Sequence, residues 1–425
     1  MNGLYWDTII TLSLISLITP FFFRGTNNEK LAIFIAIFVN IFSFAIRILT
    51  DGTFSGYLLN QQIDIETWKI LALRTSFVCA SSSLFLLLPI NRLFIKIPEN
   101  LIYYLEKIFN VFINKIPFKF FMVFNSLALL IIYFLTITAE VKFGLLGLLR
   151  FISFWGILLL NPLVKNKYFR ILNYLLLVLV AFGEGRQSII IILGSYLITN
   201  FKFSNLKIYL PKSIKFKNLR TSFYIFTLVP LMLYLFLAKG MERSTINIFA
   251  IDFKEVLKNW TLVIKYLSMS LSTPDVYVAQ YMGNYSGIFD LIKVPFIYII
   301  KFFSIFIFDK TKSLTGPCSI LTGKLTDQEA GEFSGGLCSG LVGVSDYLSN
   351  YFYPITIFYV VFALIILLIT IRIFKFLPVY QSNAIILLMS YQVAWKGADI
   401  FILLISILMV FFFTKNFYKR FRLIS

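Results

Sequence analysis

The sequence contains no histidine, and only 14% of its 425 residues are charged. The lack of histidine excludes a histidine base, a histidine nucleophile and metal sites with histidine ligands. The three cysteines, Cys79, Cys318 and Cys338, are too few and too scattered for a zinc or iron–sulfur site. We therefore expect a protein that works without a metal or another cofactor.

Apolar side chains, in contrast, make up 59% of the chain. This share is too high for an ordinary soluble domain, and several apolar runs are long enough to cross a hydrocarbon core of about 30 Å. We predict an all-α integral membrane protein with about 11 transmembrane helices, within a range of about 10–12. The predicted spans are residues 4–23, 31–49, 70–90, 120–138, 144–164, 168–182, 187–201, 221–239, 351–371, 383–395 and 399–414.

The connections between these spans alternate in charge. Basic residues concentrate in residues 92–119, 165–170, 202–220 and 372–375 and in the C-terminal tail, which places these segments in the cytoplasm by the positive-inside rule. Residues 240–350 hold nine basic and ten acidic residues, a net charge of −1. Because the whole chain has a net charge of +19, the rest of the chain carries +20. The overall positive charge therefore indicates membrane orientation and not nucleic-acid binding.

This pattern divides the chain into three parts. Residues 1–239 form an N-terminal bundle of about eight helices, residues 240–350 a large periplasmic loop, and residues 351–425 the C-terminal spans with a short basic cytoplasmic tail. We expect the bacterial inner membrane, with the N-terminus outside. The apolar stretch 288–308 is interrupted by Lys293, Pro295 and Lys301, which favours an amphipathic or re-entrant helix on the outer face, with a full span as the alternative.

Five arginines depart from the positive-inside pattern because they fall on the predicted outer side. They are Arg47, Arg74, Arg150, Arg186 and Arg243. A guanidinium suits bidentate binding of phosphate, and Arg150 lies about two turns inside its span, where a charge is costly and usually functional. The alternative is that these arginines are span ends or ion pairs, as for Arg47 and Asp51 at i, i+4.

Two pairs of short apolar segments suggest recessed turns. Residues 168–182 and 187–201 flank a turn with Glu184 and Arg186, and each would be only about 22 Å long as a helix. The segments on either side of Lys396 are similarly short. Paired short segments with glycine at the break often mark binding sites in membrane proteins, and a plain tight turn is the alternative.

Acidic and aromatic residues in the large loop are candidates for sugar binding. Asp275, Tyr277, Glu332 and Asp346 lie in polar or glycine-containing stretches, although ordinary loop chemistry also accounts for them.

Cys318 and Cys338 are the two cysteines of this loop, and in an oxidising periplasm they are expected to form a disulfide, with two free thiols as the alternative. Asp64 and Glu66 form a single carboxylate pair, which is a weak signal for a metal.

The layout resembles that of bacterial O-antigen polymerases of the Wzy type. The shared features are about 11 or 12 spans, a late large periplasmic loop, a short Gly-x-Arg motif that opens a span, and an arginine soon after a later span. Here the motif is Gly185-Arg186-Gln187-Ser188 and the later arginine is Arg243 in Gly240-Met241-Glu242-Arg243-Ser244. The resemblance in layout covers nearly the whole chain, but the motifs are short.

The resemblance implies a glycosyltransferase that joins undecaprenyl-diphosphate-linked oligosaccharide units on the periplasmic face. It also implies that a flippase and a chain-length regulator act in the same pathway. Arg186 and Arg243 match the family's arginines, while Arg150 is inferred from its position. Fixed guanidinium groups would stabilise the departing diphosphate without a metal. The general base remains open among Glu184, Asp275, Glu332 and Asp346.

Three other functions remain open. A lipid-linked oligosaccharide flippase would also need intramembrane charges, but the sequence lacks the internal repeat and has a long loop that such transporters lack. A polyprenyl-phosphate-sugar glycosyltransferase would bind metal at Asp64 and Glu66. A non-enzymatic scaffold is the least specific alternative. The related O-antigen ligases depend on a periplasmic histidine, which this sequence does not have.

Overall fold

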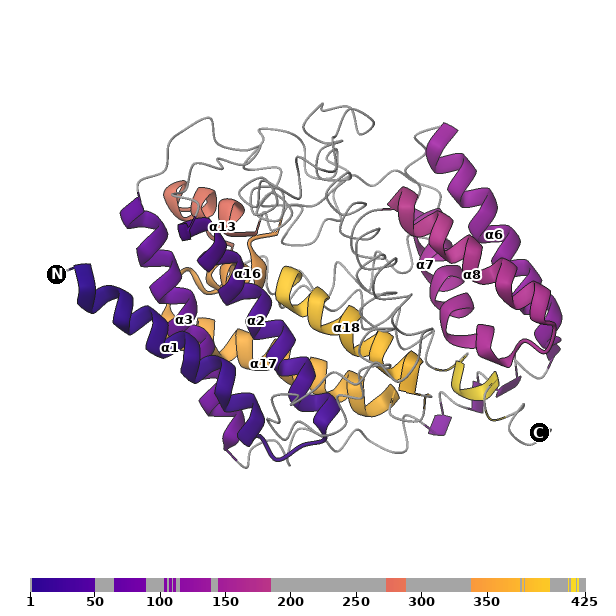
Figure 1. The fold of residues 1–425 in the computed structure, drawn as a ribbon, viewed down its shortest axis with the longest axis horizontal. Helices are drawn as coiled ribbons and strands as arrows, with labels where there is room; N and C mark the ends of the chain where they lie inside the picture. The colour runs from indigo at the N-terminus through magenta and orange to yellow at the C-terminus, as the bar shows by residue number, and fades with distance from the viewer. Residues whose placement is uncertain are drawn as a thin grey trace, which may run out of the picture.

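The structure is a computed structural model, and the residues it describes form helices and turns without a strand. The described residues are 2–49, 65–88, 103–104, 107–108, 110–111, 115–138, 144–184, 273–287, 338–374, 377, 379–397, 412, 414–417 and 419. Figure 1 shows two groups of long helices, with α1, α2, α3, α17 and α18 on one side and α6, α7 and α8 on the other.

The first group holds the longest apolar helices. They are α1 (Asn2–Phe22), α2 (Asn27–Leu49), α3 (Ile65–Leu87), α17 (Tyr353–Ile373) and α18 (Val379–Lys396). Within the described part of the chain, four helices, α1, α2, α3 and α17, are long and apolar enough to cross a membrane. The prediction of an all-helical protein with membrane-length helices is thereby confirmed, whereas the total of about 11 spans stays a prediction.

Helix α1 packs on α3 through small polar side chains. Ser13 Oγ lies 3.0 Å from Ser76 Oγ, and Ser16 Oγ donates to the Ser76 carbonyl at 3.3 Å, so the two backbones approach closely. Such contacts are typical of helix pairs in membranes. The opposite side of α1 exposes Ile10, Leu14 and Ile18, spaced four residues apart, each with about half of its surface exposed. An apolar stripe of this kind suits contact with lipid.

Helix α2 lies at the centre of this group, between α1, α3, α17 and α18. Ala32 and Ala36 are fully buried at i, i+4, and small residues at this spacing allow neighbouring helices to come close. Near the C-terminal end of α2, the ring of Phe44 packs edge-on against Trp68 of α3, with 6.3 Å between the ring centroids. This ring contact joins the last part of α2 to the first turn of α3.

The second group contains α6 (Phe118–Thr138), α7 (Gly144–Leu160) and α8 (Lys167–Glu184), with the short 3-10 helix η1 (Asn161–Leu163) before α8. Its core includes a chain of side-chain hydrogen bonds. Ser126 donates to Asn173 at 2.8 Å, and Asn173 donates to Asn161 at 2.9 Å. Satisfied polar side chains join helices inside an apolar environment.

Two short helices from the predicted large loop complete the first group. They are α13 (Thr273–Met282) and α16 (Gly340–Ser349). All ten residues of α16 are buried, as are residues 274–280 of α13. Helix α16 contacts α17, α18, α2 and α3, so it lies among the spanning helices. The sequence placed these residues in polar or glycine-containing stretches of the large loop, and the structure shows that they form buried helices packed against the spanning helices.

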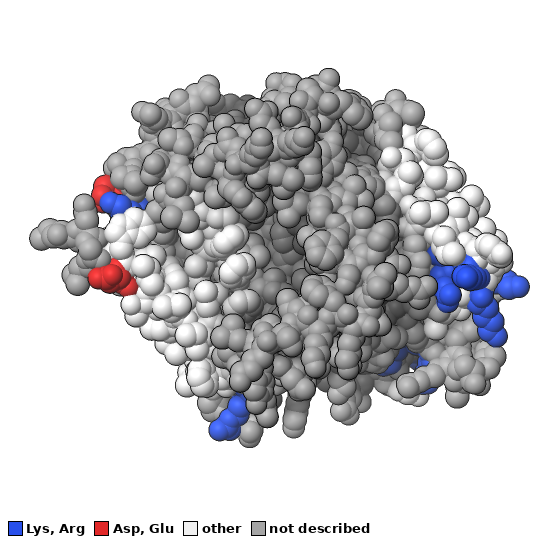
Figure 2. Space-filling view, in the orientation of Figure 1, with Lys and Arg blue, Asp and Glu red and all other residues white. Residues whose placement is uncertain are grey.

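The two ends of the first group differ in charge. We call the end with α13 and α16 the cluster end, and the end with the α1–α2 turn the basic end. Figure 2 shows acidic side chains near the N-terminus of the chain, with a basic one beside them, and basic side chains alone at the opposite end of α1. At the basic end, Glu29 of α2 forms a 2.5 Å ion pair with Arg372 of α17. Segments that the sequence placed on the same side of the membrane thus contact each other.

Candidate functional site: a buried arginine–aspartate cluster

The cluster end contains a charged group inside a spanning helix. Arg74 lies nine residues after Ile65, the first residue of α3, which places it about 14 Å along the helix. It is only 9% exposed. A buried arginine at this depth needs a partner, because an unpaired charge in an apolar environment costs several kcal/mol, roughly 3 by membrane-insertion scales.

The partner comes from α16, whose position depends on the conformation of its two ends. At its start, Gly340 has a φ of +81°, and a Cβ there would lie 2.9 Å from Asn40 Oδ1. The Leu341 amide donates to that same oxygen at 3.0 Å. At its end, Asn350 and Tyr351 have φ values of 52° and 61°. Two consecutive left-handed residues turn the chain sharply into α17.

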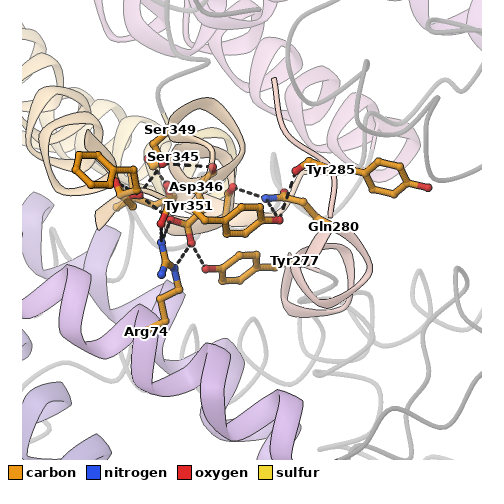
Figure 3. A network of polar contacts seen from close by, with 12 residues as sticks. Arg74, Tyr277, Gln280, Tyr285, Ser345, Asp346, Ser349 and Tyr351 are labelled. Atoms are coloured by element: carbon orange, nitrogen blue, oxygen red, sulfur yellow. Dashed lines mark hydrogen bonds and ion pairs between the residues drawn. The ribbon is translucent and has the colours of Figure 1, made fainter. Parts of the chain in front are cut away.

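Arg74 and Asp346 form a bidentate ion pair (Figure 3). Nε of Arg74 lies 2.6 Å from Oδ2, and Nη2 lies 2.7 Å from Oδ1. Nη2 also donates to the Tyr351 carbonyl at 2.7 Å. Asp346 is fully buried. This fork geometry gives a stronger and more specific contact than a single charge-assisted hydrogen bond.

Two hydroxyl groups complete the environment of the Asp346 carboxylate. Tyr277 of α13 donates to Oδ2, and Thr356 of α17 lies 2.7 Å from Oδ1. Ser349 Oγ is 2.7 Å from Thr356 Oγ1. Each carboxylate oxygen thus receives two donors, one of them from Arg74. A carboxylate bound in this way cannot accept a proton from a sugar hydroxyl, because its acceptor sites are occupied.

Aromatic rings surround the guanidinium group. The Arg74 Cζ atom lies 3.9 Å from the ring centroid of Tyr353 and 5.7 Å from that of Tyr351. Cation–π contacts in a desolvated site stabilise a charge by roughly 2 kcal/mol. Gln280 of α13 donates to the Gly343 carbonyl at 2.9 Å and lies 3.2 Å from the Tyr351 hydroxyl. These contacts join α13, α16 and the turn into α17.

Burial raises the pKa of Tyr277 well above its ordinary value, and the negative charge of Asp346 raises it further. The hydroxyl therefore stays protonated over the physiological pH range and remains a donor to Asp346. Tyr277 also packs edge-on against Phe44 of α2, with 6.0 Å between ring centroids. Tyr277 thus links α13 to both the ion pair and the apolar core.

The cluster as a whole acts as a clamp. Arg74 comes from α3, Tyr277 from α13, Asp346 from α16 and Thr356 from α17, so one carboxylate joins four helices. Asn40 of α2 provides a second attachment, because its Nδ2 donates to the Ala394 carbonyl of α18 at 3.1 Å while its Oδ1 accepts from α16. The arrangement fixes α13 and α16 at a set depth between the spanning helices.

The structure thus brings together three of the residues that the sequence singled out, Arg74, Tyr277 and Asp346. Their mutual contacts favour the ion-pair interpretation of Arg74 over direct ligand binding.

Two further predicted site residues, Asp275 and Lys396, lie outside this cluster of contacts. Asp275 is buried, two residues before Tyr277 and so on the opposite side of α13. Lys396 ends α18, and its ammonium lies 5.7 Å from the Trp395 ring. The backbone of Gly397 lies against Leu341 of α16.

Several other predicted site residues cannot be compared in the same way. Arg47, Arg150 and Glu184 belong to α2, α7 and α8, but their side chains are outside the described part. Arg186, Arg243, Glu332 and Cys318 lie outside the described residues, as do the stretch 288–308 and the predicted spans 187–201 and 221–239. Their proposed roles remain predictions.

The turn at Glu184 differs from its prediction. Helix α8 runs from Lys167 to Glu184, so Gly183 and Glu184 are helical and not part of a turn. Its 18 residues span about 27 Å, longer than the expected 22 Å. Charged and glycine residues at a helix end are not counted by an apolar-run criterion, which explains the error.

Glu66, one member of the predicted carboxylate pair, lies in the first turn of α3 and not in a loop. Its Oε1 accepts a hydrogen bond of 2.8 Å from Lys69 in the next turn. Asp64 lies outside the described residues. Within the described ranges, no group of three or more potential metal ligands occurs.

Cys338, directly before α16, is disulfide-bonded and buried. Cys79, inside α3, is a free and buried thiol. The third cysteine of the chain, Cys318, lies outside the described residues, so its pairing with Cys338 stays a prediction.

Sequence reasoning missed Asn40 and Thr356, which lie in apolar stretches without a motif.

The fold and the cluster define a helical membrane protein with two short helices clamped between its spanning helices. No protein-family model, no curated protein and no solved structure matches the chain.

Proposed function

We propose that the protein is a polysaccharide polymerase. It joins undecaprenyl-diphosphate-linked oligosaccharide repeat units on the periplasmic face of the bacterial inner membrane. The cluster end faces the periplasm, because the basic connections lie at the opposite end of the spans. The chain acts as a metal-independent glycosyltransferase and takes its substrates from the outer leaflet.

The observation that carries this proposal is the clamp itself. Two short helices from the segment 240–350 are held between spanning helices by the Arg74–Asp346 pair. A reaction between two lipid-linked glycans needs a rigid protein surface at headgroup depth, because both substrates are anchored by their lipids. Orientation of two reactants can supply several kcal/mol, roughly 7 or more, of a reaction barrier. Helices α13 and α16 are themselves buried, so they would support that surface from within and not form it.

Roles within the site follow from the geometry. Asp346 serves as a positioning residue, because its oxygens already accept four hydrogen bonds. This leaves Glu184, Asp275 and Glu332 as candidates for the base that accepts the proton of the attacking sugar hydroxyl. Arg186 and Arg243 stabilise the departing diphosphate, and the loss of one such contact typically lowers the rate about 100-fold or more.

Gene deletion followed by gel analysis of surface glycans tests this function. A strain without the protein should show lipid core carrying a single repeat unit and none of the longer chains. An unchanged ladder would contradict the proposal. A strain whose core carries no repeat unit, with lipid-linked units trapped in the cytoplasmic leaflet, would indicate a flippase instead.

A further inference from the structure

A second feature lies at the basic end, far from the cluster. A cavity of about 730 Å³ opens at the turn between α1 and α2 and beside α17. Its lining includes Phe22, Arg24, Thr26, Glu29, Lys30 and Arg372. Three of these side chains are cationic and one is anionic, so the cavity has a net charge of 3 − 1 = +2.

The single carboxylate of the cavity is fully used in local structure. Glu29 Oε2 accepts a 3.0 Å hydrogen bond from the Thr26 amide, and the Glu29 amide lies 3.3 Å from Thr26 Oγ1. This reciprocal pair is a capping box at the start of α2. Glu29 Oε1 binds Nε of Arg372 at 2.5 Å. Glu29 is only 3% exposed and therefore cannot neutralise a second cation.

The cations that remain face an open space. Arg24 is exposed, and Lys30 donates one hydrogen bond of 3.0 Å to the Phe21 carbonyl, which leaves its other protons available. Arg372 contributes a guanidinium that is held in place through Nε and is about a third exposed. Two arginines and a lysine around one cavity are the donors that bind a phosphate group well.

The apolar border of the cavity indicates the source of that phosphate. Phe22 is 71% exposed at the end of α1, and it continues the exposed stripe of Ile10, Leu14 and Ile18. A ligand with a phosphate in the cavity and acyl chains along this stripe would satisfy both surfaces. A soluble phosphate has no acyl chains that could contact this stripe.

We propose that this cavity binds the headgroup phosphate of an anionic phospholipid. Arg24 and Lys30 contact the phosphate, Arg372 is oriented towards it by Glu29, and the acyl chains follow α1. Bound lipid would hold the α1–α2 turn against α17. This inference does not depend on the catalytic function, because its residues lie at the opposite end of the helices.

Native mass spectrometry of the full-length protein in detergent tests the proposal, with phosphatidylglycerol or phosphatidylcholine added. Wild type should bind phosphatidylglycerol preferentially. The double substitution R24Q and K30Q should weaken the binding of phosphatidylglycerol by roughly 10- to 30-fold, since each of the two basic residues removed strengthens anionic-lipid binding by a factor of roughly 3 to 5. The control is K165Q with K167Q, two exposed lysines at the start of α8 that give the same charge change outside the cavity.

The control variant should bind phosphatidylglycerol like wild type. Equal losses in the two double variants, or no preference for phosphatidylglycerol in wild type, would overturn the proposal. A further arm adds millimolar glycerol phosphate as a competitor. Displacement of the lipid by this soluble phosphate at similar concentration would also overturn the assignment, because it would show that the acyl chains contribute nothing. Elution in size-exclusion chromatography confirms that each variant is folded.

Discussion

Arg74 and Asp346 are 272 positions apart in the chain, yet their side chains meet in two hydrogen bonds of 2.6 and 2.7 Å. The pair joins a spanning helix to a short buried helix from the segment predicted to be the large loop. Because both charges are buried, each one depends on the other, and the removal of a single partner is more harmful than the removal of both.

This dependence gives the first prediction. Replacing Asp346 with Leu should destabilise the protein by roughly 3–5 kcal/mol, because Arg74 would remain buried without its counter-charge. The double variant R74L and D346L should recover much of that loss. Thermal unfolding followed by size-exclusion chromatography compares the variants.

The matched control for these variants is R170L, which removes a partly exposed arginine at the start of α8. It should change stability by no more than about 0.5 kcal/mol. If the losses of R74L and D346L simply add in the double variant, the two residues are not energetically coupled and the clamp is wrongly described.

The second prediction concerns Tyr277 and alkaline pH. Its pKa is raised in the folded protein, so the unfolded chain releases this proton first, near pH 10. The contribution of the hydroxyl is therefore fully present below about pH 10 and is lost as the pH rises above that value. Replacement by Phe removes this contribution, at a cost of about 1 kcal/mol at neutral pH.

Unfolding measured from pH 8 to 11 should show a shallower alkaline decline for Y277F than for wild type. Y5F, which changes an exposed tyrosine near the N-terminus, serves as the control and should keep the wild-type slope. Parallel declines for wild type and Y277F would show that the raised pKa of Tyr277 is not linked to stability.

The third prediction tests the arginines of the proposed reaction. Substitution of Arg186 or Arg243 by Ala should shorten or abolish the glycan ladder at normal protein levels. Lys at either position should also fail, since an ammonium cannot make the bidentate contact that a guanidinium makes. Wild-type ladders from both Ala variants would remove these two residues from the mechanism, and R170K provides a matched conservative control.

The fourth prediction is that Cys318 is the disulfide partner of Cys338. Closure of this loop should stabilise the fold by roughly 3 kcal/mol in the chain-entropy model. Denatured, unreduced protein should show one labelled thiol, that of the buried Cys79, and reduction should reveal two more. Equal labelling of all three before and after reduction would exclude the bridge and argue against a periplasmic location of Cys338.

Most long helices could be predicted from the sequence, because the length of an apolar run limits where a membrane helix can lie. Predicted span 351–371 corresponds to α17 at Tyr353–Ile373, and span 4–23 to α1 at Asn2–Phe22. The starts of α2 and α3 are earlier than predicted by four or five residues. Their first turns hold polar residues, such as Glu29 and Glu66, which an apolar criterion omits.

The clamp could not be predicted as such. Helix α16 contains glycine, serine and aspartate, which are typical of a loop when their partners are unknown. One signal was present, because Arg74 lies deep in an apolar run and requires a counter-charge. Nothing in one sequence distinguishes Asp346 from other acidic residues at long range.

The most direct test of the central claim uses the purified protein in proteoliposomes with undecaprenyl-diphosphate-linked repeat units from its own host. The account predicts glycans of two or more repeat units, with one undecaprenyl diphosphate released for each new glycosidic bond. It also predicts that no added metal is needed. Movement of the lipid-linked units across the bilayer without any new glycosidic bond would contradict the account and identify a transporter.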